Sequence, residues 1–148
     1  MDPIKTLEKE HDDISREIIE FETIMDSEVV NYPNLIHVFK RFCSLWDSHE
    51  NKEERIFSIM NRKMMTIPIE TIKTDHEYLC GHIKNMKEAI NSGDDYRVRK
   101  CFEDDLKVLI EKIKKHMELE DDILYTVSPD EFSDSEVNEM KEVILRYI

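Results

Sequence analysis

The sequence has few of the residues that turns and sheets need, with only 2 glycines and 4 prolines among 148 residues. A β-sandwich or β-barrel needs a turn every few residues, and glycine and proline are prominent in such turns. The chain is instead 40% hydrophobic and 37% charged and has 8 methionines. This composition is typical of helices that are apolar on one face and wet on the other. Length and composition together predict one all-α domain with a buried core.

Cysteines and long apolar runs are also scarce. The three cysteines, Cys43, Cys80 and Cys101, form no CxxC pair and leave one unmatched, which favours a reducing compartment over a disulfide framework. The N-terminal segment MDPIKTLEKEHDD lacks the apolar stretch of a signal peptide, and no stretch approaches membrane-spanning length. We therefore expect a cytoplasmic protein with no membrane partner.

Basic residues are in the minority, with 21 Lys and Arg against 34 Asp and Glu, for a net charge of -13. Such a chain repels the phosphates of nucleic acids and anionic lipid headgroups. We therefore predict no nucleic-acid partner. Most of the acidity serves solubility, and a count of charges does not reveal which carboxylates bind a cation.

Apolar residues that recur every three or four positions predict four long helices. Asp2 and Pro3 form a typical helix start, and Gly93 a typical stop. We expect helices over residues 3–26, 33–64, 69–90 and 96–125. Because the loops are short, neighbouring helices are antiparallel, which predicts an up-down-up-down four-helix bundle over residues 1–127. Ser133 and Glu136 form a capping-box pattern that predicts a short further helix in an extension, residues 128–148, packed on the bundle.

Polar residues interrupt the apolar stripe of each predicted helix. Every stripe contains one histidine, and two stripes add a glutamate one turn later: His11, His49, His76, His116, Glu53 and Glu120. Residues four apart lie on the same helix face. An unpaired buried polar group costs about 2–7 kcal/mol of free energy. The cost of several such groups would exceed the free energy of unfolding of a typical protein, roughly 5–15 kcal/mol. We therefore expect these side chains to share one or two metal ions.

The positions along the bundle support this interpretation only in part. His11 and His49 are about equally far from the first turn and should meet. His76 and His116 differ by a few residues, at about 1.5 Å per residue, a mismatch that slack around Gly93 would absorb. A single histidine on an apolar face is usually a hydrogen-bonded core residue, whereas four with two glutamates favour a metal centre.

The types of ligand narrow the choice of metal. Imidazole and carboxylate together suit iron, manganese or zinc, and two carboxylates among four histidines favour a dinuclear site over a tetrahedral zinc. The segment HENKE at residues 49–53 is not the HExxH of zinc proteases. Only Glu8 and His11 match the Glu-x-x-His pairs of ferritin-like proteins. His37 and His82 lie off the stripes, and we assign them to the surface or to supporting positions.

Four motifs occur in order along the chain: LEKEHDDI, HENKE, DHEYL and HMELE. This ordered set resembles the hemerythrin-like (HHE cation-binding) family over residues 7–125. The resemblance implies a non-haem diiron centre inside a four-helix bundle. It also implies the roles of the six side chains: His11 and His49 on one iron, His76 and His116 on the other, and Glu53 and Glu120 bridging the two.

The sequence departs from the pattern of the oxygen-carrying members. They have a second histidine four residues after the one on the third helix, and here that position holds Cys80. Cys80, a water molecule or Glu50 would take the missing place. Those members also use an aspartate five residues after the last histidine, which corresponds to Asp121. We prefer Glu120 because residue i+5 points about 140° away.

The resemblance implies a protein that binds or senses O2, nitric oxide, peroxide or iron. One missing imidazole favours sensing, storage or peroxide chemistry over reversible oxygen carriage. We expect binding rather than turnover, and weak peroxidase or oxidase activity is an alternative. A second alternative is a helical module with a structural metal, whose C-terminal helix docks a protein partner or a second copy of the chain. The third is a metal-free polar network.

Overall fold

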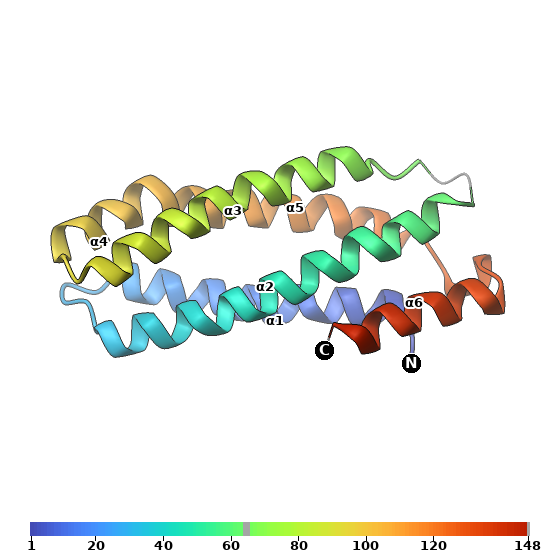
Figure 1. Ribbon diagram of the computed structural model, residues 1–148, viewed down its shortest axis with the longest axis horizontal. Helices are drawn as coiled ribbons and strands as arrows, with labels where there is room; N and C mark the ends of the chain where they lie inside the picture. The colour runs from blue at the N-terminus through green and yellow to red at the C-terminus, as the bar shows by residue number, and fades with distance from the viewer. Residues whose placement is uncertain (64–65, 148) are drawn as a thin grey trace.

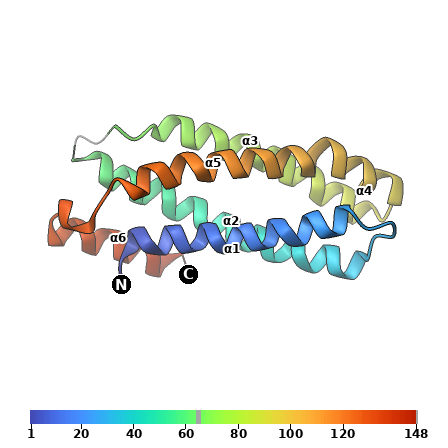
Figure 2. The same ribbon diagram turned by 180° about the vertical axis from the view of Figure 1, so that it is seen from behind.

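The computed structural model describes residues 1–63 and 66–147 (Figures 1 and 2). Within these ranges the chain is helical and contains no strand. The elements are α1 (Pro3–Met25), α2 (Tyr32–Asn61), α3 (Ile69–Ser92), α4 (Asp95–Cys101), a π-helical turn (Phe102–Leu106), α5 (Lys107–Tyr125), a 3-10 turn (Pro129–Glu131) and α6 (Asp134–Arg146). The predicted all-α fold is confirmed.

Local chemistry accounts for where the helices begin and end. The Asp2 carboxylate accepts hydrogen bonds from the first backbone N–H groups of α1, and Asn31 does the same for α2. Gly93, at φ 66°, ends α3 in the left-handed conformation that glycine adopts without strain. Ser133 and Glu136 form the predicted capping box of α6. The predicted end of the second helix, at Met64, lies outside the described residues.

The predicted fourth helix, residues 96–125, is not uniform. It consists of α4, the π-helical turn and α5. Val98, Phe102 and Leu106 are all buried at two successive four-residue steps, longer than the 3.6-residue period of an α-helix. The π-helical turn takes up the extra length, so that residues before and after it both face the core.

The long helices run antiparallel, with α4 and α5 forming the fourth rod of the bundle (Figure 1). At one end α6 turns back and lies along α1 and α2, beside the N-terminus (Figures 1 and 2). It buries Met140, Val143 and Ile144 against the bundle. Burying an aliphatic side chain stabilises a fold by about 1.5–3 kcal/mol, so α6 is an integral part of this fold.

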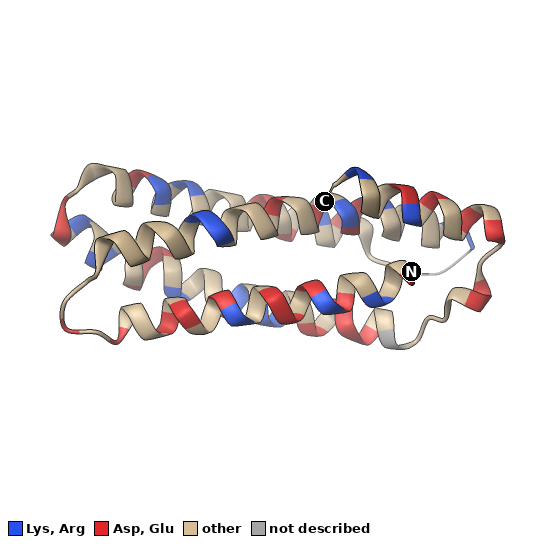
Figure 3. Ribbon diagram, turned by 90° about the horizontal axis from the view of Figure 1, so that it is seen from below, with Lys and Arg blue, Asp and Glu red and all other residues tan. Residues whose placement is uncertain are grey.

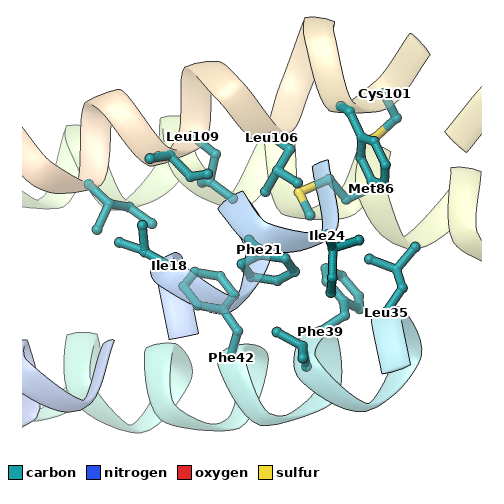
Figure 4. Packing of buried hydrophobic residues seen from close by; sticks show 14 of the residues in the cluster. Ile18, Phe21, Ile24, Leu35, Phe39, Phe42, Met86, Cys101, Leu106 and Leu109 are labelled. Carbon is teal, nitrogen blue, oxygen red and sulfur yellow. The ribbon is translucent and has the colours of Figure 1, made fainter. Parts of the chain in front are cut away.

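Two apolar clusters fill the interior. The first lies toward the α1–α2 loop and contains Phe21 and Phe42, whose rings meet edge to face with centroids 5.6 Å apart (Figure 4). The second contains Ile56, Met60 and Leu124 and includes the buried face of α6. The polar residues of the interior lie between these clusters.

Positions of acidic and basic residues are interspersed along the helices, with acidic ones more frequent (Figure 3). This pattern fits a bundle whose apolar residues lie in its interior. In the described part of the chain, no helix has the length and apolar character needed to cross a bilayer.

Candidate metal centre

The six polar residues predicted from the apolar stripes come together in one layer. On α1, for example, His11 lies between Leu7 of the second cluster and Ile14 of the first. The same order recurs on α2, α3 and α5, so the level mismatch considered for the third and fourth helices does not occur. The exposed fractions are small: His11 4%, His49 1%, Glu53 0%, His76 2%, His116 3% and Glu120 0%.

The first half-site comprises His11 and His49. The Nε2 atom of His11 lies 3.2 Å from Glu120 Oε1 and 3.4 Å from Glu53 Oε2. The Nε2 atom of His49 lies 3.1 Å from Glu53 Oε1. One ligand atom from each of these four residues falls within 4.8 Å of the others. That spacing suits one cation.

The second half-site comprises His76 and His116. The Nε2 atom of His76 lies 3.4 Å from Glu53 Oε1, and that of His116 lies 3.0 Å from Glu120 Oε2. The two Nε2 atoms are 3.0 Å apart. These residues also satisfy the 4.8 Å condition together with Glu53 and Glu120. Both glutamates are therefore shared by the two half-sites.

Several inward-facing atoms of this layer have no hydrogen-bond partner among the described residues. They are Glu53 Oε1, both carboxylate oxygens of Glu120 and His49 Nε2. Buried polar atoms without partners are rare because each costs free energy. Here short distances bring imidazole nitrogens and carboxylate oxygens together without the alignment of hydrogen bonds. A cation that takes their lone pairs would satisfy them, so the donor set fits a metal centre.

Each of the four imidazoles also has a carboxylate on its outer nitrogen. A carboxylate there accepts the Nδ1–H and leaves the Nε2 lone pair directed inward, the arrangement typical of metal-binding histidines. The Nδ1 contacts are His11 with Asp121 at 2.7 Å, His49 with Glu10 at 2.9 Å, His76 with Glu54 at 3.0 Å and His116 with Asp75 at 3.1 Å.

Sequence reasoning missed three of these carboxylates, Glu10, Glu54 and Asp75. All three are half-buried and lie beside the apolar stripes rather than on them, so the stripe pattern gave no signal for them. Asp121, considered as an additional ligand, lies at the outer nitrogen of His11. Glu10 also accepts a 2.5 Å hydrogen bond from Lys52, whose side chain is only 6% exposed.

The other two additional candidates lie outside both ligand groups. Cys80 is exposed, and its Sγ lies 3.7 Å from Glu50 Oε1. Glu50 approaches the outer nitrogen of His76, at 3.9 Å, rather than the inner one. Partial desolvation of the thiol and the neighbouring Glu50 carboxylate raise the pKa of Cys80 to about 11, which keeps the thiol protonated. His82 contacts Asp105 at 2.9 Å, away from the centre.

The metal-free layer holds protons where cations would lie. Burial disfavours the charged form of His11, but the adjacent Glu120 and Glu53 carboxylates outweigh this effect and raise the pKa of His11 to about 11. Interactions with the carboxylates also raise the pKa values of His49 and His76 to about 9. Burial opposes the Glu53 carboxylate, yet the surrounding imidazoles hold its pKa well below the usual range. Cations would therefore have to displace protons at neutral pH.

Trp46 closes the centre on the side of the first cluster. Its ring is fully buried, and its centroid lies 5.6 Å from that of His76, 6.2 Å from His49 and 6.3 Å from His116. Trp46 belongs to the first cluster and thus places an aromatic ring of that cluster beside both half-sites. A dry wall of this kind strengthens electrostatic interactions within the centre.

The comparisons with known proteins agree with this geometry. The family model described as the hemerythrin HHE cation binding domain matches residues 2–127. No curated protein and no solved structure gives a significant match. The match covers the bundle and all six residues of the polar layer, but not α6. The chain belongs to the hemerythrin HHE cation-binding family.

Proposed function

We propose that this protein is a non-haem diiron protein that binds or senses O2 or a related small oxidant. The observation that carries the proposal is the sharing of Glu53 and Glu120, since both carboxylates reach both pairs of imidazoles. Two ligand groups that share two carboxylates suit a bridged pair of cations. Two imidazoles and two carboxylates around each position suit iron, with zinc or manganese as alternatives.

The ligand count leaves room for a small molecule. Each position has two imidazoles and two shared carboxylates, fewer than the six ligands of an octahedral ion. Two ferrous ions would supply the two electrons that O2 takes up on binding. Glu53 and Glu120 would hold both cations, and the outer carboxylates would accept the Nδ1–H groups and so direct the Nε2 lone pairs at the cations.

The second half-site is the one that we propose small molecules reach. A cavity of about 210 Å³ lies between α3 and α5 and is lined by Asp75, Tyr78, Leu79, Lys112, Lys115, His116 and Leu119. His116 lines this cavity, so a small molecule that enters it comes beside a residue of the second half-site. Trp46 and the first cluster would exclude water from the opposite side.

Anaerobic loading with ferrous iron tests the proposal. Elemental analysis should find two iron ions per chain, and exposure to O2 or nitric oxide should produce an absorption band in the near ultraviolet. Zinc alone, or less than one metal per chain after loading, would contradict it. Sustained consumption of peroxide would shift the function toward a diiron peroxidase.

A further inference from the structure

A second cavity, of about 440 Å³, opens between α2, α3 and α6. One stripe of α2, at residues 51, 54, 55, 58, 59 and 62, forms one wall, because these positions follow helical three- and four-residue steps. Lys73 of α3 and the end of α6 complete it. The cavity depends on α6, which lies outside the region matched by the family model.

Basic side chains converge on this cavity. Arg55, Arg62, Lys73 and Arg146 all line it. Arg62 pairs with Glu139 at 2.7 Å, and the Arg55 guanidinium lies 5.0 Å over the Tyr147 ring. Among the described residues, no carboxylate lies within 4.0 Å of the charged groups of Arg55, Lys73 or Arg146. Other lysines in the described part of the chain also lack a carboxylate partner. Arg55, Lys73 and Arg146 differ from them because all three line the same cavity.

The remaining walls supply apolar surface. Ile59 is 5% exposed and Val143 is 9% exposed, and both line the cavity. The volume falls within the roughly 300–1,000 Å³ of sites for small molecules. Guanidinium groups match the geometry of phosphate oxygens. An acidic protein partner would bind through a flat surface, which would not fill a concave site with an apolar floor. The shape of the site therefore favours a small molecule.

We propose that this cavity binds a small organic phosphate, with its phosphate group at Lys73 and Arg146 and its apolar part against Val143 and Ile59. The chain carries a net charge of -13, which repels anions in general. The cavity is therefore a local exception that selects for an anion of the right shape.

The cavity also shares one residue with the metal centre. Glu54 lines it, and Glu54 Oε1 lies 3.0 Å from Nδ1 of His76. Cations in the centre would add positive charge beside the cavity and so strengthen binding of the phosphate, and by linkage the phosphate would strengthen binding of the cations. This coupling rests on the proposed function, whereas phosphate binding to the metal-free chain does not.

Calorimetric titration of the full-length, metal-free protein tests the site. Adenosine 5′-monophosphate and inorganic phosphate are the two probes. We expect saturable binding of the nucleotide tighter than about 1 mM, and weaker binding of inorganic phosphate because it lacks an apolar part. Equal affinity for both probes would identify a free-phosphate site and overturn the organic ligand. Absence of saturable nucleotide binding would overturn the site itself.

Paired variants locate the binding. Lys73→Gln/Arg146→Gln should weaken nucleotide binding by at least about tenfold, because it removes two charge-assisted contacts. Lys40→Gln/Lys84→Gln changes net charge equally, at exposed positions that line neither cavity, and should change affinity less than about twofold. Circular dichroism confirms that each variant is folded. Equal losses in both pairs would show non-specific attraction and contradict the proposal.

Titration of the metal-loaded protein tests the coupling separately. We expect nucleotide binding to be tighter by about threefold or more than in the metal-free protein. Equal affinities in the two forms would overturn the coupling. If the protein does not bind metal while the metal-free form still binds the nucleotide, the result contradicts the proposed diiron function and supports the phosphate site.

Discussion

The two half-sites present the same ligands but are held differently. At the first half-site, the carboxylate on His49 is Glu10, which is 17% exposed and pairs with the buried Lys52, and the carboxylate on His11 is Asp121, which is 36% exposed. At the second, the carboxylates on His76 and His116 are 33% and 44% exposed. Both cavities described above adjoin the second half-site. We infer that the first half-site anchors its cation and that the second exchanges ligands with the surroundings.

The shared glutamates should dominate both half-sites, so their removal should have the largest effect. Glu53→Gln should abolish binding of both cations, because it removes one negative charge from each ligand group. In the metal-free protein it leaves buried imidazolium groups without their anion, and unfolding free energy should fall by about 3–5 kcal/mol. Elemental analysis after dialysis and urea denaturation measure the two effects.

The control for Glu53→Gln is Glu20→Gln, an exposed position on α1. This variant should bind both cations with unchanged stability. Retention of one tightly held cation by Glu53→Gln would mean that the half-sites do not share this carboxylate.

Variants of the outer carboxylates should affect the two half-sites to different extents. Glu10→Gln should weaken cation binding at the first half-site by about 10–100-fold, and it should also destabilise the protein by about 3 kcal/mol because Lys52 loses its buried partner. Asp75→Asn should have a smaller effect on both quantities, since Asp75 is the more exposed. Competition with a chelator and urea denaturation provide the measurements. Equal effects of the two variants would contradict the asymmetry.

Stability should depend on pH in opposite directions with and without metal. In the metal-free protein, the raised pKa values of His11, His49 and His76 mean that the folded state binds more protons than the unfolded state above about pH 6.5. Their contribution is complete below that pH and is lost as pH rises through about 9 to 11. Cations require neutral imidazoles, so metal binding should instead strengthen as pH rises from 6 to 8.

Thermal unfolding measured across this pH range, with chelator and with metal, checks both directions. The melting temperature should fall with rising pH in chelator, while the difference between the two forms should grow. The same slope in both forms would show that the imidazoles do not exchange protons for cations.

The smallest effect is expected at Cys80. Its thiol is exposed and faces Glu50 rather than the shared carboxylates. Cys80→Ser should therefore leave the number of bound cations unchanged and alter their affinity by less than about twofold. Elemental analysis and chelator competition apply here as well. Loss of one cation would show that the thiol completes the second half-site.

The sequence predicted the helices and the polar layer because both follow from periodicity. His11, His49, His76, His116, Glu53 and Glu120 are buried because they occupy positions of the apolar stripes. The outer carboxylates follow no such rule: Glu10 neighbours His11 in the chain but contacts His49 on the adjacent helix α2. The π-helical turn also escaped prediction, because one extra residue in a stripe resembles ordinary variation between three- and four-residue steps.

The central claim is that two cations lie between Glu53 and Glu120. Anomalous X-ray diffraction at the iron edge, from crystals of protein loaded anaerobically with ferrous iron, tests it most directly. The account predicts two peaks per chain, one beside Nε2 of His11 and His49 and the other beside Nε2 of His76 and His116. A single peak, or no peak within the polar layer, would contradict it.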